Sequence, residues 1–152
     1  IGYDKSLNRA LYKSLKASGQ RVSNYGTVFA TIADNDKEAA LPLIRRFYNL
    51  GFNIEATSGT AMYLKEHGIK TRIREKLSQG SEEILTSIRK GYVTYVVNTI
   101  SEGNNKTRRD GIQIRRCAID NNVPVFTCLD TVNVLLNVLE ETTMGISTID
   151  EE

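Results

Sequence analysis

Side chains that can hold an anion follow the ends of several apolar runs in this sequence. In the stretch "EATSGT", the hydroxyls of Thr57, Ser58 and Thr60 surround Gly59 directly after an apolar run. A turn of this kind that opens a helix directs free backbone N–H groups and short hydroxyl donors at one point. The same residue types are also the usual helix caps. The stretch therefore predicts a helix cap, an anion site, or both.

The order of the apolar runs predicts the elements that position these side chains. Short apolar and β-branched runs predict strands within 26–33, 52–57, 71–74, 92–98 and 123–128. Amphipathic helical patterns separate and flank them, over 4–18, 36–50, 59–68, 81–91, 112–122 and 130–141. The polar segment 101–111 is expected to be a loop bordering the site. This alternation predicts an α/β fold with a five-stranded parallel sheet and helices on both faces.

The carboxyl ends of parallel strands meet at one edge of a sheet, which is where ligands bind in such folds. The segments 33–37, 57–60, 74–76 and 98–100 should therefore face one space, bringing together two lysines and several hydroxyl and amide side chains. That set suits a phosphorylated small molecule. The candidate binding residues are Lys37, Thr57, Ser58, Gly59, Thr60, Lys76, Asn98 and Thr99.

Charge and composition limit the other classes of function. Among 152 residues, Lys plus Arg number 20 and Asp plus Glu 18, so the net charge of +2 argues against a nucleic-acid-binding face. The apolar runs are strand-sized, which predicts no membrane span. The first residues lack the apolar centre of a signal peptide, and we expect a cytoplasmic protein.

The cysteines and the single histidine are expected to be structural. Cys117 and Cys128 have no neighbouring ligand pairs and are predicted to be buried free thiols. His67 precedes Gly68, a pattern typical of a helix C-terminus. We therefore expect neither a metal site nor a cofactor.

Four stretches resemble a known family. They are "DNDK" at 34–37, "LGFNIEATSGTAMYLKEHGI" at 50–69, "YVVNT" at 95–99 and "DGIQIRRCAI" at 110–119. Together they are similar to the methylglyoxal-synthase-like fold, and within it to the C-terminal regulatory domain of the carbamoyl phosphate synthetase large chain. The pattern "LNRALYKSLKASG" also resembles the segment that joins this domain to the catalytic body. By this resemblance, residues 1–25 are a leading helix and linker and residues 26–152 the regulatory domain.

The resemblance implies regulation rather than synthesis. The family domain binds allosteric effectors, such as uridine or inosine monophosphate in bacterial enzymes, and an acetylated amino acid in urea-cycle enzymes. Matched by position, Lys37, Thr57, Thr60 and Lys76 would hold the effector phosphate, with Asn98 beside it. The implied partners are the catalytic domains of the large chain and the glutaminase small chain of an ATP-dependent ligase serving pyrimidine and arginine biosynthesis. No catalytic residue is expected in this chain.

One departure and three alternatives accompany this interpretation. Relatives commonly carry a second threonine after Thr99, where this chain has Ile100, so either a phosphate contact is lost or Ser101 supplies it. A methylglyoxal synthase would need a carboxylate base after a glycine pair, whereas "SQGSEEIL" has no Gly-Gly-Asp. The cyclohydrolase half of the bifunctional purine enzyme would need a lysine- and histidine-bearing segment that this sequence lacks. A pure protein-interaction module is the remaining alternative.

Overall fold

The computed structural model describes residues 25–74, 82–99 and 105–144 of the chain. Five strands form one sheet: β1 (Thr27–Thr31), β2 (Asn53–Thr57), β3 (Thr71–Arg74), β4 (Tyr95–Asn98) and β5 (Val125–Phe126). A short 3-10 turn, η1 (Asp34–Asp36), leads into α2 (Lys37–Asn49). The other described helices are α3 (Ser58–Glu66), α4 (Glu83–Arg89), α5 (Asn105–Asp120) and α6 (Leu129–Met144). This confirms the α/β fold expected from the sequence.

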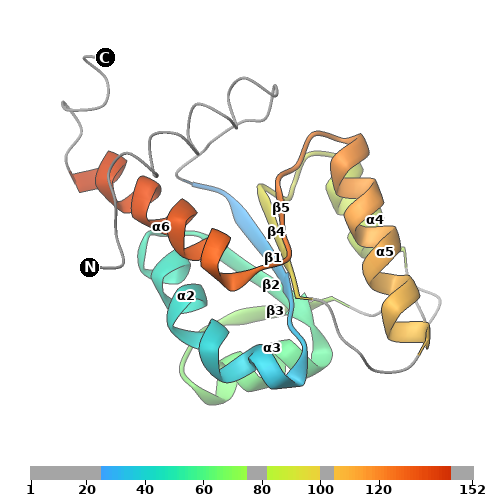
Figure 1. Cartoon of the computed structure of the whole chain (residues 1–152), viewed down its shortest axis with the longest axis horizontal. Coiled ribbons are helices and arrows are strands. Elements are labelled where there is room, and N and C mark those ends of the chain that lie inside the picture. Colours follow the sequence, from blue (N-terminus) through green and yellow to red (C-terminus); the bar gives the residue numbers. More distant parts are fainter. Residues whose placement is uncertain (1–24, 75–81, 100–104, 145–152) are drawn as a thin grey trace.

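The sheet is parallel throughout and is wound outward from its centre. The strand order is β3-β2-β1-β4-β5 (Figure 1). The chain runs from β1 to β3 in one direction, then returns across the sheet to β4 and continues to β5. Because βαβ crossovers are right-handed, the two directions place their helices on opposite faces. Figure 1 shows this result, with α2 and α3 on one face and α4 and α5 on the other. The order reverses between β1 and β4, and ligands of such sheets bind beside that point.

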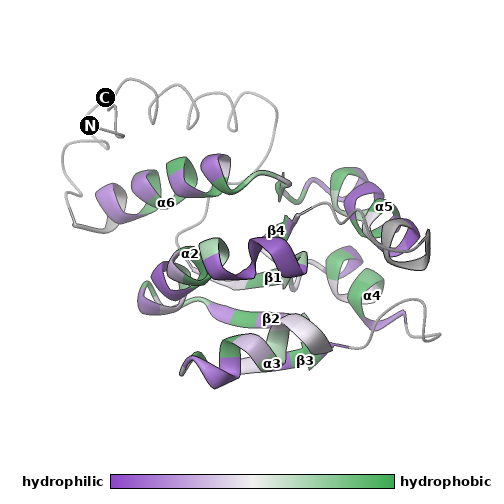
Figure 2. Ribbon diagram, turned by 60° about the horizontal axis from the view of Figure 1, so that its bottom comes forward, coloured by the Kyte–Doolittle hydropathy of each residue, from purple (hydrophilic) through white to green (hydrophobic). Residues whose placement is uncertain are grey.

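Two apolar clusters fill the space between the sheet and its helices. The larger cluster lies under α2, α3 and α6 and surrounds the buried rings of Phe47 and Tyr95. The smaller cluster lies under α4 and α5, around Phe29 and Ile114. Alternate residues of β1 and β4 serve the two clusters, as the pleat of a strand requires. Figure 2 shows the apolar faces of the helices turned toward the sheet.

Arg46 joins α2 to α6 over the larger cluster. Its guanidinium donates to both carboxylate oxygens of Glu140, at 2.9 and 2.5 Å. It also donates to the side-chain oxygens of Asn133 at 2.6 Å and Asn137 at 2.9 Å. All three partners belong to α6, on the side that faces α2. The planar fork of arginine therefore fixes the position of α6 along α2.

Gly26 begins the first strand in a conformation that only glycine adopts easily. Its φ is +125°, and a Cβ at this position would lie 2.0 Å from Thr94 Oγ1. Thr94 in turn accepts the backbone N–H of Thr27 at 3.2 Å, while the carbonyl of Gly26 accepts the N–H of Asn53 at 2.9 Å. The close approach at Gly26 thus aligns the starts of β1, β2 and β4.

Three sequence predictions are wrong in detail. The segment predicted as a loop at 101–111 is helical from Asn105 onward, because α5 continues through Gly111. The fifth strand is limited to Val125–Phe126. Cys128 lies beyond this short strand and is exposed, whereas Cys117 is buried as expected. His67 is the C-cap of α3, which confirms its predicted place.

Some predictions concern residues that the structure does not describe. The leading helix at 4–18, Lys76, Ile100 and Ser101 all lie outside the described ranges. Across the helices that are described, none has the length and apolarity needed to cross a membrane.

Candidate functional site

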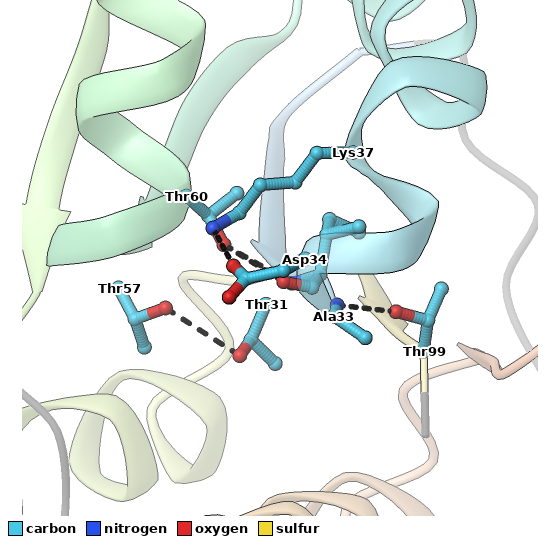
Figure 3. Close-up of polar contacts among 8 residues, drawn as sticks. Thr31, Ala33, Asp34, Lys37, Thr57, Thr60 and Thr99 are labelled. Atoms are coloured by element: carbon cyan, nitrogen blue, oxygen red, sulfur yellow. Dashed lines mark hydrogen bonds and ion pairs between the residues drawn. The ribbon is translucent and has the colours of Figure 1, made fainter. Parts of the chain in front are cut away.

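The loop after β1 is held by threonine hydroxyls from three other elements (Figure 3). Thr60 Oγ1, in the first turn of α3, accepts the N–H of Ile32 at 3.1 Å. Thr99 Oγ1, just after β4, accepts the N–H of Ala33 at 2.7 Å. Thr57 Oγ1, at the end of β2, lies 3.4 Å from Thr31 Oγ1. These contacts bring the ends of β1, β2 and β4 together and fix where α2 begins.

The threonines do not cap α3, contrary to part of the sequence interpretation. Thr57 occupies the N-cap position with extended backbone, but its side chain makes no capping hydrogen bond. The helix begins at Ser58, one residue before the predicted start at Gly59. The hydroxyls instead join α3 to the neighbouring loop. The first turn of α3 therefore lacks a side-chain cap from Thr57, which leaves its N–H groups and its positive dipole end for another acceptor.

Lys37 brings a cation to this site. It is the first residue of α2, and its Nζ lies 2.5 Å from Asp34 Oδ1. The Lys37 side chain is only 16% exposed, whereas that of Asp34 is 91% exposed. A Cβ on Gly59 would lie 3.7 Å from Nζ, so the ammonium sits against the start of α3. Figure 3 shows the ammonium beside Asp34 and Thr60. A positive charge and a helix N-terminus thus meet at one point.

A row of polar residues crosses the same edge on the face covered by α4 and α5. Thr31 pairs in register with Asn98 of β4, and Thr57 pairs with Arg74 of β3. The Thr57–Thr31 hydroxyl contact joins the two pairs. We call Arg74, Thr57, Thr31 and Asn98 the polar row. Phe29 and Val96, two residues before Thr31 and Asn98, belong to the apolar cluster under α4 and α5, so the row lies on that face.

The polar row ends in Arg74 on one side, and a second arginine contacts Asn98 at its other end. Arg74 donates to the two carboxylate oxygens of Glu55, at 3.0 and 3.4 Å, and both side chains are largely buried. The hydrogen bond from Arg74 to Glu55 raises the pKa of Arg74 above the ordinary value of an arginine. At the other end, Arg115 Nη1 of α5 donates to Asn98 Oδ1 at 2.9 Å. Arg74 falls in the segment 74–76 that was expected at this edge, but neither arginine was among the candidate binding residues.

The structure brings most of the predicted site residues to this edge. Lys37, Thr57, Thr60 and Thr99 lie around the loop after β1 in Figure 3, and Ser58 and Gly59 belong to the first turn of α3. Asn98 lies in the adjacent polar row and is 2% exposed. Sequence analysis missed Thr31, Glu55 and Arg115, and it placed Asp34 and Arg74 at this edge without naming them as binding residues. A signal existed for Arg115, because Gly111 precedes it by one helical turn and leaves room for a long side chain.

The described side chains favour anion binding over metal binding. Within residues 25–74, 82–99 and 105–144, no group of three or more His, Cys, Asp or Glu could hold a metal ion. Lys37 supplies a charge, and the threonines supply hydroxyls. Thr60 already accepts one hydrogen bond, and its hydroxyl oxygen lies 3.5 Å from the Ile32 carbonyl oxygen, which is long for a bond in which it donates. The hydroxyl proton can therefore turn toward a ligand oxygen.

Comparison with known proteins agrees with this fold. A family model described as MGS-like domain matches residues 39–127. The chain belongs to the MGS-like domain family. A solved structure, methylglyoxal synthase from Elizabethkingia anophelis, is similar to it with a TM-score of 0.62 and 15% identity. The similarity covers 76% of this chain and 79% of that one. At this identity the likeness shows that the two MGS-like domains share a fold.

Proposed function

We propose that this MGS-like domain binds the phosphate group of a small-molecule effector and is the regulatory domain of a carbamoyl phosphate synthetase large chain. The observation that carries the proposal is the position of Lys37, whose ammonium lies against the uncapped start of α3. A phosphate dianion would gain a charge-assisted bond from the ammonium and further bonds from the helix N–H groups. A nucleoside monophosphate is the effector class that the family resemblance implies.

Regulation places a thermodynamic demand on the site. An effector shifts the activity of a larger enzyme only if it binds the active and inactive states with different affinities. The threonine contacts couple the end of β4 and the start of α3 to the loop before α2. A phosphate bound there would contact three segments of the domain at once. For regulation, the catalytic domains of the large chain would then have to contact those segments, so that a change in their position alters activity.

One observation favours a second candidate, methylglyoxal synthase. That enzyme removes a proton from a triose phosphate and therefore needs a carboxylate base beside the phosphate site. Asp34 provides a carboxylate next to Lys37. However, the Asp34 side chain is 91% exposed and paired with an ammonium, whereas a base for a carbon acid works best where water is excluded. We therefore propose the regulatory function first and keep the synthase as the second candidate.

Two measurements on the same preparation distinguish the candidates. Calorimetric titration would compare uridine monophosphate, inosine monophosphate, phosphoribosyl pyrophosphate and N-acetylglutamate. A parallel assay would measure phosphate release from dihydroxyacetone phosphate. We expect a nucleotide to bind without turnover. Turnover of dihydroxyacetone phosphate would instead support the synthase, and binding of N-acetylglutamate alone would contradict the phosphate site.

Matched lysine variants test the location of the site. Lys37→Met removes the proposed phosphate cation, and loss of a charge-assisted bond should weaken binding by about 1.5–3 kcal/mol. Lys65→Met removes the same charge from the last turn of α3, at the opposite end of that helix. It should leave the affinity within about twofold, because an exposed charge more than a Debye length away is screened. Equal losses in both variants would show a non-specific charge effect.

A further inference from the structure

Asn98 is a buried amide whose two polar atoms are used unequally. Its residue exposure is 2%, and it ends β4 at the point where the strand order reverses. The side-chain oxygen accepts a hydrogen bond from Arg115 Nη1 at 2.9 Å. For the side-chain nitrogen, the described part of the chain supplies no acceptor. A buried amide nitrogen without an acceptor is costly, and such groups in native proteins call for an explanation.

Arg115 fixes which way the Asn98 amide points. A guanidinium has only donors, so the atom that faces it must be the amide oxygen. The nitrogen is then fixed as the other branch of the planar amide group, and no described residue accepts its hydrogens. Without Arg115, the amide could rotate by half a turn about its last bond and present its oxygen instead. An oxygen at that place would repel an anion, whereas the NH2 group donates to one.

Gly111 makes this arrangement possible. It lies within α5, one turn before Arg115, where glycine is unfavourable for a helix. A Cβ at position 111 would lie 3.1 Å from Arg115 Nη1 and 3.5 Å from Asn98 Oδ1. The absence of a side chain therefore lets α5 approach the end of β4 closely enough for the Arg115–Asn98 bond.

We propose that Arg115 is a positioning residue for the anion site, which orients Asn98 so that its amide nitrogen donates to a bound phosphate. This inference rests on the proposed function, since it needs an anion at the edge of the sheet. It differs from a direct role for Arg115, in which the guanidinium itself would contact the ligand. The two roles make different predictions when Asn98 is absent.

A double-mutant cycle separates the two roles, with inorganic phosphate and uridine monophosphate as the probes. Arg115→Met keeps the apolar stem and removes the donors, and it should weaken binding about three- to tenfold, as expected for one lost hydrogen bond. In an Asn98→Ala background, the same change should cost less than about twofold, because there is no amide left to orient. A full-sized loss in that background would overturn the proposal in favour of a direct contact.

Two further variants keep the test decisive if Arg115→Met proves unstable. Arg115→Lys retains a donor that can reach an amide oxygen and should recover part of the affinity. Gly111→Ala should leave the helix folded, since alanine favours it, yet weaken phosphate binding by displacing the flexible guanidinium. Unchanged affinity in Gly111→Ala, with unfolding no easier, would contradict the proposed role of the close approach.

The control is Arg116→Met, which removes the same charge from the next, exposed position of α5. It should leave phosphate affinity within about twofold, because an exposed charge is weakly coupled to its surroundings. If the unmodified protein binds neither probe, both this inference and the proposed function fail. If it binds and Lys37→Met abolishes binding while Arg115→Met does not alter it, only the positioning role fails.

Discussion

Thr60 Oγ1 lies 3.1 Å from the backbone nitrogen of Ile32, and this bond joins the first turn of α3 to the loop after β1. The contact is buried, with Thr60 only 3% exposed. The Thr60 hydroxyl, which the sequence predicts as a helix cap or a ligand contact, therefore stabilises the fold of the free protein. It holds in place the loop from which Lys37 and Asp34 emerge.

Thr60→Val should destabilise the fold by about 1–3 kcal/mol, because it preserves shape but leaves the buried N–H of Ile32 without an acceptor. Urea unfolding would measure the change. Thr60→Ser keeps the oxygen and is the matched control, which should lose less stability. If the valine variant unfolds at the same urea concentration as the unmodified protein, the Thr60–Ile32 hydrogen bond contributes nothing to the free energy of unfolding.

Asp34→Asn should strengthen phosphate binding several-fold, since the carboxylate now neutralises Lys37 and would repel a dianion. The effect should shrink at about 1 M salt, because both the ion pair and the repulsion are screened there. Calorimetry at low and high salt would test both parts. Asp36→Asn, in the same short turn, is the control for overall charge. Weaker binding in Asp34→Asn would show that the carboxylate is a ligand contact instead.

Gly26→Ala should destabilise the protein by more than the 1–2 kcal/mol that a left-handed conformation costs, because its Cβ would also collide with Thr94 Oγ1. Gly91→Ala separates the two effects. Its φ is +79°, but no atom lies within 4 Å of the added Cβ, so only the backbone cost remains. Thermal unfolding of both variants would show whether the loss in Gly26→Ala exceeds the backbone cost seen in Gly91→Ala. Equal losses would show that Thr94 moves aside freely.

The two thiols should differ in reactivity and in their effect on stability. Burial raises the pKa of Cys117, while Cys128 is exposed, so a thiol reagent should label Cys128 rapidly in the folded protein and Cys117 only on unfolding. The folded state favours the protonated Cys117 thiol. The stability that this thiol contributes is therefore fully present below the ordinary thiol pKa of about 8.5. That contribution is lost as the pH rises through the folded pKa. Cys117→Ala should flatten this alkaline decline, and rapid labelling of both thiols would refute the assignment.

The order of the strands and helices could be predicted because each signal is local. The strand at Thr71–Arg74 and the helix end at His67 lie where β-branched residues and glycine predict them. The start of α5 could not be predicted in this way, because Gly111 has the local signature of a loop. Its reason for being there is the approach to Asn98, a residue thirteen positions earlier in the sequence.

The site was predictable as a location but not as a set of contacts. The rule that strand ends converge placed Lys37, Thr57, Thr60 and Thr99 at one edge, where the structure has them. The partners of each hydroxyl depend on the separation of two strands and one helix, which no local pattern encodes. Thr57 accordingly contacts Thr31 instead of capping α3.

The outer strand β3 has a consequence for how this protein behaves at high concentration. Within the described part of the chain it is the outermost strand on one side of the sheet, and such edges can recruit strands from other molecules. The exposed Arg72 stands beside the exposed Ile73, so a second copy of the strand would bring like charges together. At the opposite edge, β5 offers only two residues for pairing. The charge of Arg72 should therefore oppose edge-to-edge association at β3, and replacing Arg72 with an apolar residue should promote that association.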